Sequence, residues 1–206
     1  MLSKKLSFCM KNIVFDLAGV VFARNEARCP QELMDYFYFI NSGNPMPDFW
    51  NDYDRGTRSF DNVAQCLAEF RGSDIQTASH MMATAITYQD QVVPTANLIA
   101  ELKKLGYRLF VLSNMSKEYI NYLRKMPVYQ YFEADVVSCD VGFIKPEREI
   151  YSLLLERFNL DPAQTMFIDD RKENVLAAAE LGITPFHFDR KNPLQSCNQI
   201  RELLKK

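Results

Sequence analysis

The sequence predicts an α/β protein: a doubly wound, parallel, Rossmann-like sheet forms its core, and a block of helices is inserted after the first strand. Apolar, β-branched runs alternate with helical patterns from residue 94 to the C-terminus, as in parallel sheets with crossover helices. Residues 23–92 carry helical periodicity without a clear strand. We therefore expect a core made of residues 1–22 and 93–206 and a helical cap made of residues 23–92.

The stretch 12–22 begins with an apolar, β-branched run that ends at Asp16 and is followed by a glycine turn, which predicts the first strand with Asp16 at its carboxyl end. Within the insert, apolar residues at helical spacing predict one helix over residues 33–40 and another over residues 60–70, with Gly72 ending the second. The charged start of residues 1–9 resembles a signal peptide, but Lys11 interrupts the apolar part. We interpret residues 1–9 as a non-essential extension.

The second part of the chain repeats strand and helix. The predicted elements are a helix over 94–105, a strand over 107–112, a helix over 117–125, a strand over 134–138, a helix that opens at Pro146, a strand over 165–168, a helix that ends before Gly182, a strand over 183–187 and a helix over 194–204. Right-handed crossovers join parallel strands in such a series.

Composition and charge favour a soluble protein that acts on small molecules. Apolar residues make up 48% of the chain, the net charge is −2 and the pI is about 5.8, so we expect no nucleic acid or membrane partner. The five cysteines are scattered and lack metal-ligand spacing, which is typical of a reducing compartment. The expected location is the cytoplasm.

Polar residues follow four of the predicted strands, although each strand itself is apolar. These residues are Asp16, Ser113 with Asn114, Lys145, and Asp169 with Asp170. A single polar residue after a strand is usually a helix cap or a turn former. Four such positions in one doubly wound fold have a different meaning, because the carboxyl ends of its strands meet at one crevice.

The chemistry of these residues is consistent with phosphoryl transfer. Asp16 and Asp170, with Asp169 in an outer layer, offer the hard oxygen ligands that Mg²⁺ prefers. Lys145 precedes a predicted helix start, where a bound anion such as phosphate would offset the unfavourable positive charge. The Ser113 hydroxyl adds a donor, and an Asp16 oxygen could attack phosphorus.

Four segments together resemble the motifs of the haloacid dehalogenase-like hydrolase superfamily. They are Asp16-Leu-Ala-Gly-Val20, Leu112-Ser-Asn114, Gly142-Phe-Ile-Lys-Pro-Glu-Arg-Glu-Ile-Tyr151 and Phe167-Ile-Asp-Asp-Arg-Lys-Glu-Asn174. The helical insert is similar to the C1 cap of that superfamily, and the stretch 50–70 resembles the branch that includes α-D-glucose-1-phosphate phosphatases. The resemblance covers essentially the whole core.

The resemblance implies a Mg²⁺-dependent phosphatase that forms an aspartyl-phosphate on Asp16. It implies that the Ala18 backbone carbonyl and Asp170 complete the Mg²⁺ shell, and that Ser113 and Lys145 hold the phosphoryl group. Asn114 is a further candidate for phosphate binding, and Arg24, which follows the nucleophile loop, could reach the substrate. The expected substrate is a small phosphorylated metabolite, and a sugar phosphate is favoured.

Ala18 departs from the motif, because most phosphatases of the superfamily carry there an Asp that protonates the leaving oxygen and later activates water. Such help is worth about 10² to 10⁴ in rate. Three explanations stay open: a substrate with a good leaving group, a replacement by an ordered water or a cap residue such as His80 or Tyr53, or lost catalysis. The last would make the protein a ligand-binding or regulatory module.

Two other activities of similar enzymes fit less well. Haloacid dehalogenases need no Mg²⁺ and lack the paired acids, so Asp169-Asp170 argues against that reaction. Phosphonoacetaldehyde hydrolases also carry Ala two residues after the nucleophile, but they use a cap lysine, and residues 24–93 contain none.

Overall fold

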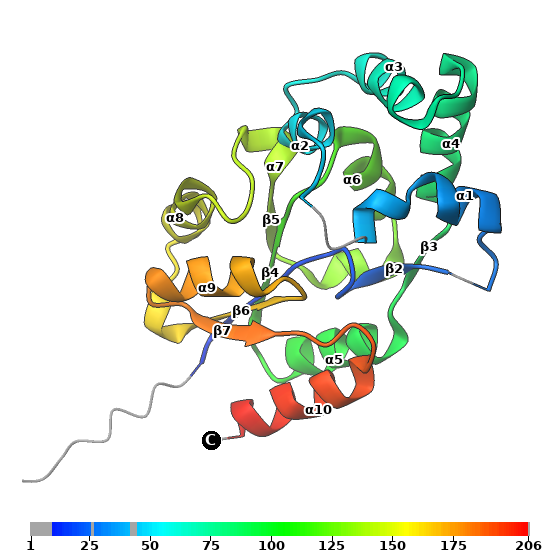
Figure 1. The fold of residues 1–206 in the computed structure, drawn as a ribbon. Helices are drawn as coiled ribbons and strands as arrows, with labels where there is room; N and C mark the ends of the chain where they lie inside the picture. Colours follow the sequence, from blue (N-terminus) through cyan, green and yellow to red (C-terminus); the bar gives the residue numbers. More distant parts are fainter. Residues whose placement is uncertain (1–9, 26, 42–44, 206) are drawn as a thin grey trace, which may run out of the picture.

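The computed structural model of the protein describes residues 10–25, 27–41 and 45–205. Figure 1 shows a parallel sheet with helices on both faces and a group of helices to one side. The core sheet has five strands in the order β5-β4-β1-β6-β7. They are β1 (Asn12–Phe15), β4 (Arg108–Ser113), β5 (Ala134–Val137), β6 (Thr165–Asp169) and β7 (Thr184–His187). The predicted α/β fold with a parallel core sheet is confirmed.

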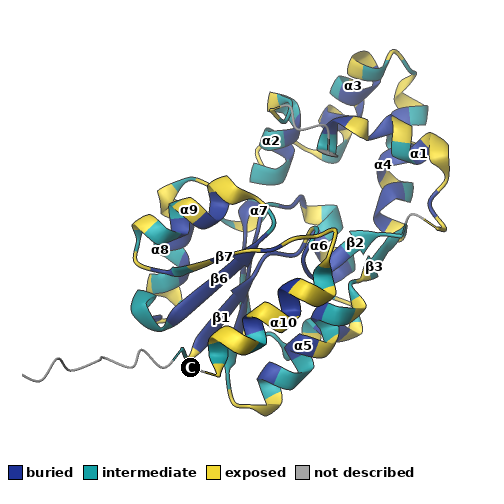
Figure 2. Ribbon diagram, turned by 60° about the horizontal axis from the view of Figure 1, so that its bottom comes forward, coloured by how far each residue is buried: buried dark blue, intermediate teal, exposed yellow. Residues whose placement is uncertain are grey.

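Two apolar clusters cover the two faces of this sheet, because successive side chains of a strand point to opposite sides. On β1, Ile13 and Phe15 belong to one cluster and Val14 to the other. Helices α5 (Val93–Lys104) and α10 (Pro193–Leu204) lie on the first face, and α8 (Arg148–Arg157) and α9 (Lys172–Glu180) lie on the second (Figure 2). The strands are buried on both sides, as is typical of parallel sheets.

The inserted helices are α1 (Gln31–Tyr36), α2 (Asp48–Arg55), α3 (Phe60–Arg71) and α4 (Ile75–Thr87), with a short 3-10 turn, η1 (Tyr38–Asn41). They enclose an apolar cluster of their own, in which Phe37, Phe39 and Trp50 pack edge to face. The sequence pattern identified the regions of α1 and α3 but not α2 or α4. The domain boundaries at residues 22/23 and 92/93 stay a prediction.

The expectation that the insert lacks strands needs a correction at its two ends. A short antiparallel ribbon pairs β2 (Phe22–Arg24) with β3 (Gln89–Gln91) where the chain leaves and re-enters the core. Three-residue strands are too short to produce a visible period-two pattern. The ribbon joins the inserted helices to the core by two paired connections.

The remaining core elements are α6 (Lys117–Leu123), the 3-10 turns η2 (Pro127–Tyr131) and η3 (Pro162–Gln164), and the single-turn helix α7 (Ser138–Val141). Helix α7 occupies residues just after β5 and was not anticipated. Within the described ranges, no helix combines the length and apolar character that a membrane span requires. The prediction about residues 1–9 lies outside the described residues.

Candidate active site

Asp16 follows the central strand of the sheet, at the point where the strand order reverses. The chain passes from β1 to β4 and β5 on one side, and then to β6 and β7 on the other. Ser113 ends β4 and Asp169 ends β6, the two strands that pair with β1. Ligands of doubly wound sheets bind at such a switch point. The structure therefore brings these three strand ends to the expected crevice.

Lys145 is the buried cation at the centre of this crevice. Its Nζ atom lies 2.8 Å from Asp16 Oδ1 and 2.6 Å from Asp169 Oδ2, and it donates to the Leu112 carbonyl at 3.0 Å. Burial by itself would lower the pKa of Lys145, but the Asp16 and Asp169 carboxylates raise it above its ordinary value. Lys145 therefore stays positively charged.

The Asp16 carboxylate is held by two donors at one oxygen. Ser113 Oγ donates to Asp16 Oδ1 at 2.8 Å, and Lys145 contacts the same atom. Burial raises the pKa of Asp16 to about 7; Lys145 lowers it, while the charges of Asp169 and Asp170 raise it further. A bound cation would favour the ionised form that a nucleophile requires.

Asp169 is fully engaged with protein groups. Its Oδ2 accepts from Lys145, its Oδ1 accepts the Arg171 backbone amide at 2.8 Å, and the Asn174 amide donates to both oxygens at 3.0 and 3.1 Å. Asn174 is 3% exposed, so its amide belongs to the interior of the site. Asp169 is thus suited to orient Lys145 and leaves little capacity for direct metal binding.

Asp170 lies against the turn that follows Asp16. A Cβ atom on Gly19 would lie 2.6 Å from Asp170 Oδ2, and Gly19 has a φ of +80°, a conformation that glycine adopts without strain. Burial and the Asp169 charge raise the pKa of Asp170, while Arg190, 3.4 Å away, lowers it. The turn thus gives Asp170 the room to approach Asp16.

The donor set fits a magnesium ion. Carboxylate oxygens of Asp16, Asp169 and Asp170 lie within 4.8 Å of one another, and Lys145 pairs with Asp16 and Asp169. Because Asp169 is committed to other partners, Asp16 and Asp170 are the two carboxylates suited to bind the ion. One or two carboxylates, waters and a substrate phosphate are a typical Mg²⁺ shell.

Asn114 contacts the backbone of Lys145. Its amide nitrogen donates to the Lys145 carbonyl at 2.9 Å, and its oxygen accepts the Lys145 amide at 2.7 Å. Both polar atoms of the side chain therefore position the lysine. The prediction that Asn114 itself contacts phosphate stays a prediction.

The helix after Lys145 begins later than expected. Helix α8 starts at Arg148 and not at Pro146, so Lys145 lies outside its first turn. The charge of Lys145 is compensated by Asp16 and Asp169, and the expected conflict with the helix dipole does not arise. Proline is common at the first position of a helix, but Pro146 precedes the first residue of α8 by two positions.

Neither residue considered as a replacement for the missing acid is favoured by its surroundings. Tyr53 is 3% exposed and donates to Glu118 Oε2 at 2.7 Å, and burial raises its pKa. His80 is exposed on α4 and contacts Thr84 of the same helix. Ala18 itself is exposed, with no side chain that could donate a proton.

Arg24 lies at the junction between β2 and the inserted helices. Its guanidinium stands 5.7 Å from the centre of the Phe37 ring, and its Nε atom is buried without a hydrogen-bond partner. Burial raises the pKa of Tyr119 to about 12, and the neighbouring Arg24 opposes this rise. Contact between Arg24 and substrate stays a prediction.

Asp54, the penultimate residue of α2, is not among the site residues predicted from the sequence. Burial raises the pKa of its carboxyl group to about 7, Arg171 and the Ser116 backbone amide lower it, and the charge of Asp16 raises it. An inserted helix therefore contributes an acidic group to the same crevice. The available signal was an acid two residues before Gly56, the glycine that ends α2 with a φ of +79°.

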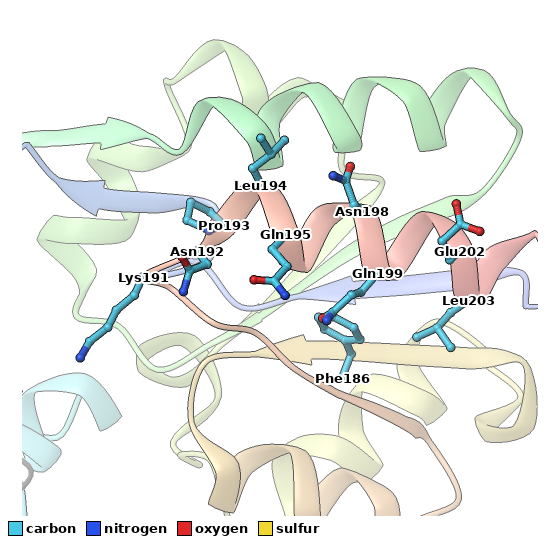
Figure 3. Close-up of a pocket in the computed structure, with 10 residues that line it drawn as sticks. All are labelled: Phe186, Lys191, Asn192, Pro193, Leu194, Gln195, Asn198, Gln199, Glu202 and Leu203. Atoms are coloured by element: carbon cyan, nitrogen blue, oxygen red, sulfur yellow. The ribbon is translucent and has the colours of Figure 1, made fainter.

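A surface hollow of about 950 Å³ lies elsewhere, between α10 and the edge strand β7. Figure 3 shows its lining, which includes Phe186, Leu194 and Leu203. None of the residues around Asp16 lines it. Its size is therefore no guide to the chemistry at the strand ends.

Comparisons with known proteins agree with this geometry. A sesquiterpene phosphatase from Aspergillus oryzae is 29% identical over 199 residues, which cover 94% of this chain and 96% of that protein. A D-ribitol-5-phosphate phosphatase from Bacteroides thetaiotaomicron is 23% identical over 194 residues, which cover 86% of this chain and 91% of that protein.

Solved structures show the same fold. A HAD-like family hydrolase from Porphyromonas gingivalis has a TM-score of 0.74 and 24% identity, with 96% of this chain and 99% of that chain covered. A HAD family enzyme from Bacteroides thetaiotaomicron, in complex with magnesium and inorganic phosphate, has a TM-score of 0.70 and 24% identity. The match covers 88% of this chain and 95% of that chain. A family model described as haloacid dehalogenase-like hydrolase matches residues 10–182. The chain thus belongs to the haloacid dehalogenase-like hydrolases, a family of enzymes.

Proposed function

We propose that the protein is a Mg²⁺-dependent phosphatase that hydrolyses a small phosphorylated metabolite through an aspartyl-phosphate on Asp16. The observation that carries the proposal is the position of Asp16, whose Oδ1 lies 2.8 Å from both Ser113 Oγ and Lys145 Nζ, in a crevice shared with Asp170. This arrangement suits attack by a carboxylate on phosphorus. Membership in a hydrolase family and the phosphatase names of the relatives support it.

In this proposal, Asp16 attacks the phosphorus atom and Ser113 and Lys145 hold the phosphoryl oxygens. Their two donors converge on one point, where they can stabilise negative charge as it develops. Asp169 keeps Lys145 in place through the 2.6 Å ion pair. Mg²⁺ bound by Asp16, Asp170 and the Ala18 carbonyl would neutralise phosphate charge and polarise its oxygens.

We propose a sugar phosphate as the substrate class, in keeping with the resemblance of the cap to the sugar-phosphatase branch. The related D-ribitol-5-phosphate phosphatase supports this class, while the related sesquiterpene phosphatase offers an apolar alternative. A panel of sugar phosphates, flavin mononucleotide and isoprenoid phosphates distinguishes these classes by kcat/KM.

The decisive experiment measures phosphate release from p-nitrophenyl phosphate and from the panel, with Mg²⁺ and with EDTA. We expect Mg²⁺-dependent turnover, and we expect Asp16→Asn to abolish it while the circular dichroism spectrum is retained. Asp61→Asn, an exposed acid in the first turn of α3, is the matched control and should keep full activity. Retained Mg²⁺ binding without turnover of any ester would identify a non-catalytic module instead.

A further inference from the structure

The proposed reaction requires a proton donor that Ala18 cannot supply. Departure of an alkoxide from phosphorus is slow unless the oxygen is protonated as the bond breaks. The acid must lie near Asp16 and yet outside the group of residues that holds the phosphoryl oxygens. Asp54 meets both conditions.

The end of α2 lies at the carboxyl edge of the sheet, because Ser138 Oγ, just after β5, donates to the Asp54 carbonyl and accepts the backbone amide of Met115, two residues after the end of β4. The Ser116 backbone amide and the charges of Arg171 after β6 and of Asp16 after β1 act on the Asp54 carboxyl group. The loops after these strands surround the place where a phosphate on Asp16 would lie. As a whole residue, Asp54 is partly exposed.

The backbone around Asp54 is fixed on the core, so the carboxyl group has a defined position. Ser138 Oγ donates to the Asp54 carbonyl, and Arg55 forms a bidentate ion pair with Glu147 at 2.6 and 2.9 Å. A Cβ atom on Gly56 would lie 2.6 Å from the Cys139 carbonyl, so the end of α2 packs closely on α7. Asp54, Arg55 and Gly56, which form the end of α2, thus each contact the core directly.

The surroundings of the Asp54 carboxyl group change its pKa. Burial raises the pKa of its carboxyl group to about 7, Arg171 and the Ser116 amide lower it, and the charge of Asp16 raises it. Tyr53, its neighbour, is committed to Glu118.

We propose that Asp54 is the general acid and base of this enzyme and replaces, from the inserted helix α2, the acid that is absent at Ala18. This inference rests on the phosphatase function proposed above. It places the proton donor on the cap side of the crevice, while the nucleophile stays on the core side.

The two half-reactions balance as follows. An Asp16 oxygen forms a bond to phosphorus, the bond from phosphorus to the leaving oxygen breaks, and the Asp54 proton passes to that oxygen to give an alcohol. Asp54, now a carboxylate, then takes a proton from water as the water oxygen attacks phosphorus. The Asp16–phosphorus bond breaks, inorganic phosphate leaves, and both acids return to their starting states.

The test compares kcat/KM of Asp54→Asn for p-nitrophenyl phosphate, which has a good leaving group, and for an alkyl phosphate, which has a poor one. Because kcat/KM covers the steps up to departure of the leaving group, it reports proton donation. We expect a loss of about 10² to 10⁴ for the alkyl ester and less than about tenfold for the aryl ester. With p-nitrophenyl phosphate the variant should also release a burst of one product per enzyme, since loss of the base slows hydrolysis of the aspartyl-phosphate.

Asp52→Asn is the matched control, because Asp52 lies on the same helix but pairs with Arg58 at the surface. It should change neither rate. Adding Ala18→Asp to Asp54→Asn should restore the alkyl rate by at least about tenfold, because it supplies the missing acid from the core side.

An equal loss for both esters, or no loss for the alkyl ester, overturns the role of Asp54 while leaving the phosphatase function intact. Absence of turnover by the wild-type protein overturns both proposals. If Asp54→Asn does not fold, Ala18→Asp alone decides: an alkyl rate within about threefold of wild type supports Asp54, and a gain of about 10² or more refutes it.

Discussion

Lys145→Met removes the positive charge that lies between two buried carboxylates. The lysine side chain is 2% exposed, and its Nζ atom has three acceptors: Asp16 at 2.8 Å, Asp169 at 2.6 Å and the Leu112 carbonyl at 3.0 Å. All three of its N–H donors are therefore used. Methionine is of similar length and uncharged, so the substitution tests the charge with little change in packing.

The expected cost follows from this geometry. Removing one partner of a buried ion pair destabilises a protein by about 3–5 kcal/mol, because the remaining charge is left without compensation. Here Asp16 keeps its bond from Ser113 and Asp169 keeps its bonds from Asn174, so we expect a loss near the lower limit, about 3 kcal/mol. Activity should fall by about 10² to 10³ through loss of charge stabilisation at the phosphoryl group.

Urea denaturation in EDTA measures the free energy of unfolding without metal. Arg201→Met is the control, because Arg201 forms a surface ion pair with Glu101 at 2.8 Å, and it should cost less than about 1 kcal/mol. In a double-mutant cycle, Asp16→Asn should relieve about 1 kcal/mol or more of the Lys145→Met cost. A cost below about 1 kcal/mol for Lys145→Met, or the absence of coupling, would refute the central role of the lysine charge.

Three further predictions concern the metal and the residues around it. Gly19→Ala should weaken Mg²⁺ binding, measured by calorimetry, because the added Cβ would displace Asp170. Gly72→Ala is its control: Gly72 has a φ of +66° and nothing within 4 Å, so the substitution should leave Mg²⁺ binding unchanged and lower only the free energy of unfolding, by about 1–2 kcal/mol. Tyr53→Phe should cost about 0.5–1.5 kcal/mol in urea through loss of the bond to Glu118, with the same ratio of alkyl to aryl rates as wild type; a selective fall in the alkyl rate would assign the acid role to Tyr53. Mg²⁺ at about 100 times its Kd should stabilise the protein by about 2.7 kcal/mol, or roughly 5 to 10 °C in Tm, and an unchanged Tm would contradict metal binding at the acidic cluster.

Local patterns were sufficient for the core. Apolar runs separated by helical periods predicted the parallel sheet, since side-chain periodicity reflects which faces of an element are buried. The polar residues at the strand ends could also be predicted, because parallel strands place their carboxyl ends at one edge. Asp16, Ser113, Lys145 and Asp169 are joined there by hydrogen bonds and ion pairs.

Sequence patterns predicted less of the structure where contacts join segments that are distant in the chain. The ribbon of β2 and β3 pairs residues 22–24 with 89–91, and three-residue strands carry too little periodicity to be recognised. The roles of Asn114 and Asn174 depend on their partners, the Lys145 backbone and the Asp169 carboxylate, which lie on other elements or beyond a turn. An asparagine in a sequence does not reveal whether it binds a ligand or a neighbour.

The sequence by itself determined the nucleophile candidate Asp16, the acidic pair beside it, and the absence of an acid at Ala18. Only the tertiary structure decided which acid of the inserted helices lies near the strand ends. Helix α2 and its Asp54 are brought to the strand ends by packing on α7 and by the Arg55–Glu147 ion pair, contacts between segments far apart in the chain. Local propensity carries no information about such contacts, because they depend on how the inserted helices lie on the core.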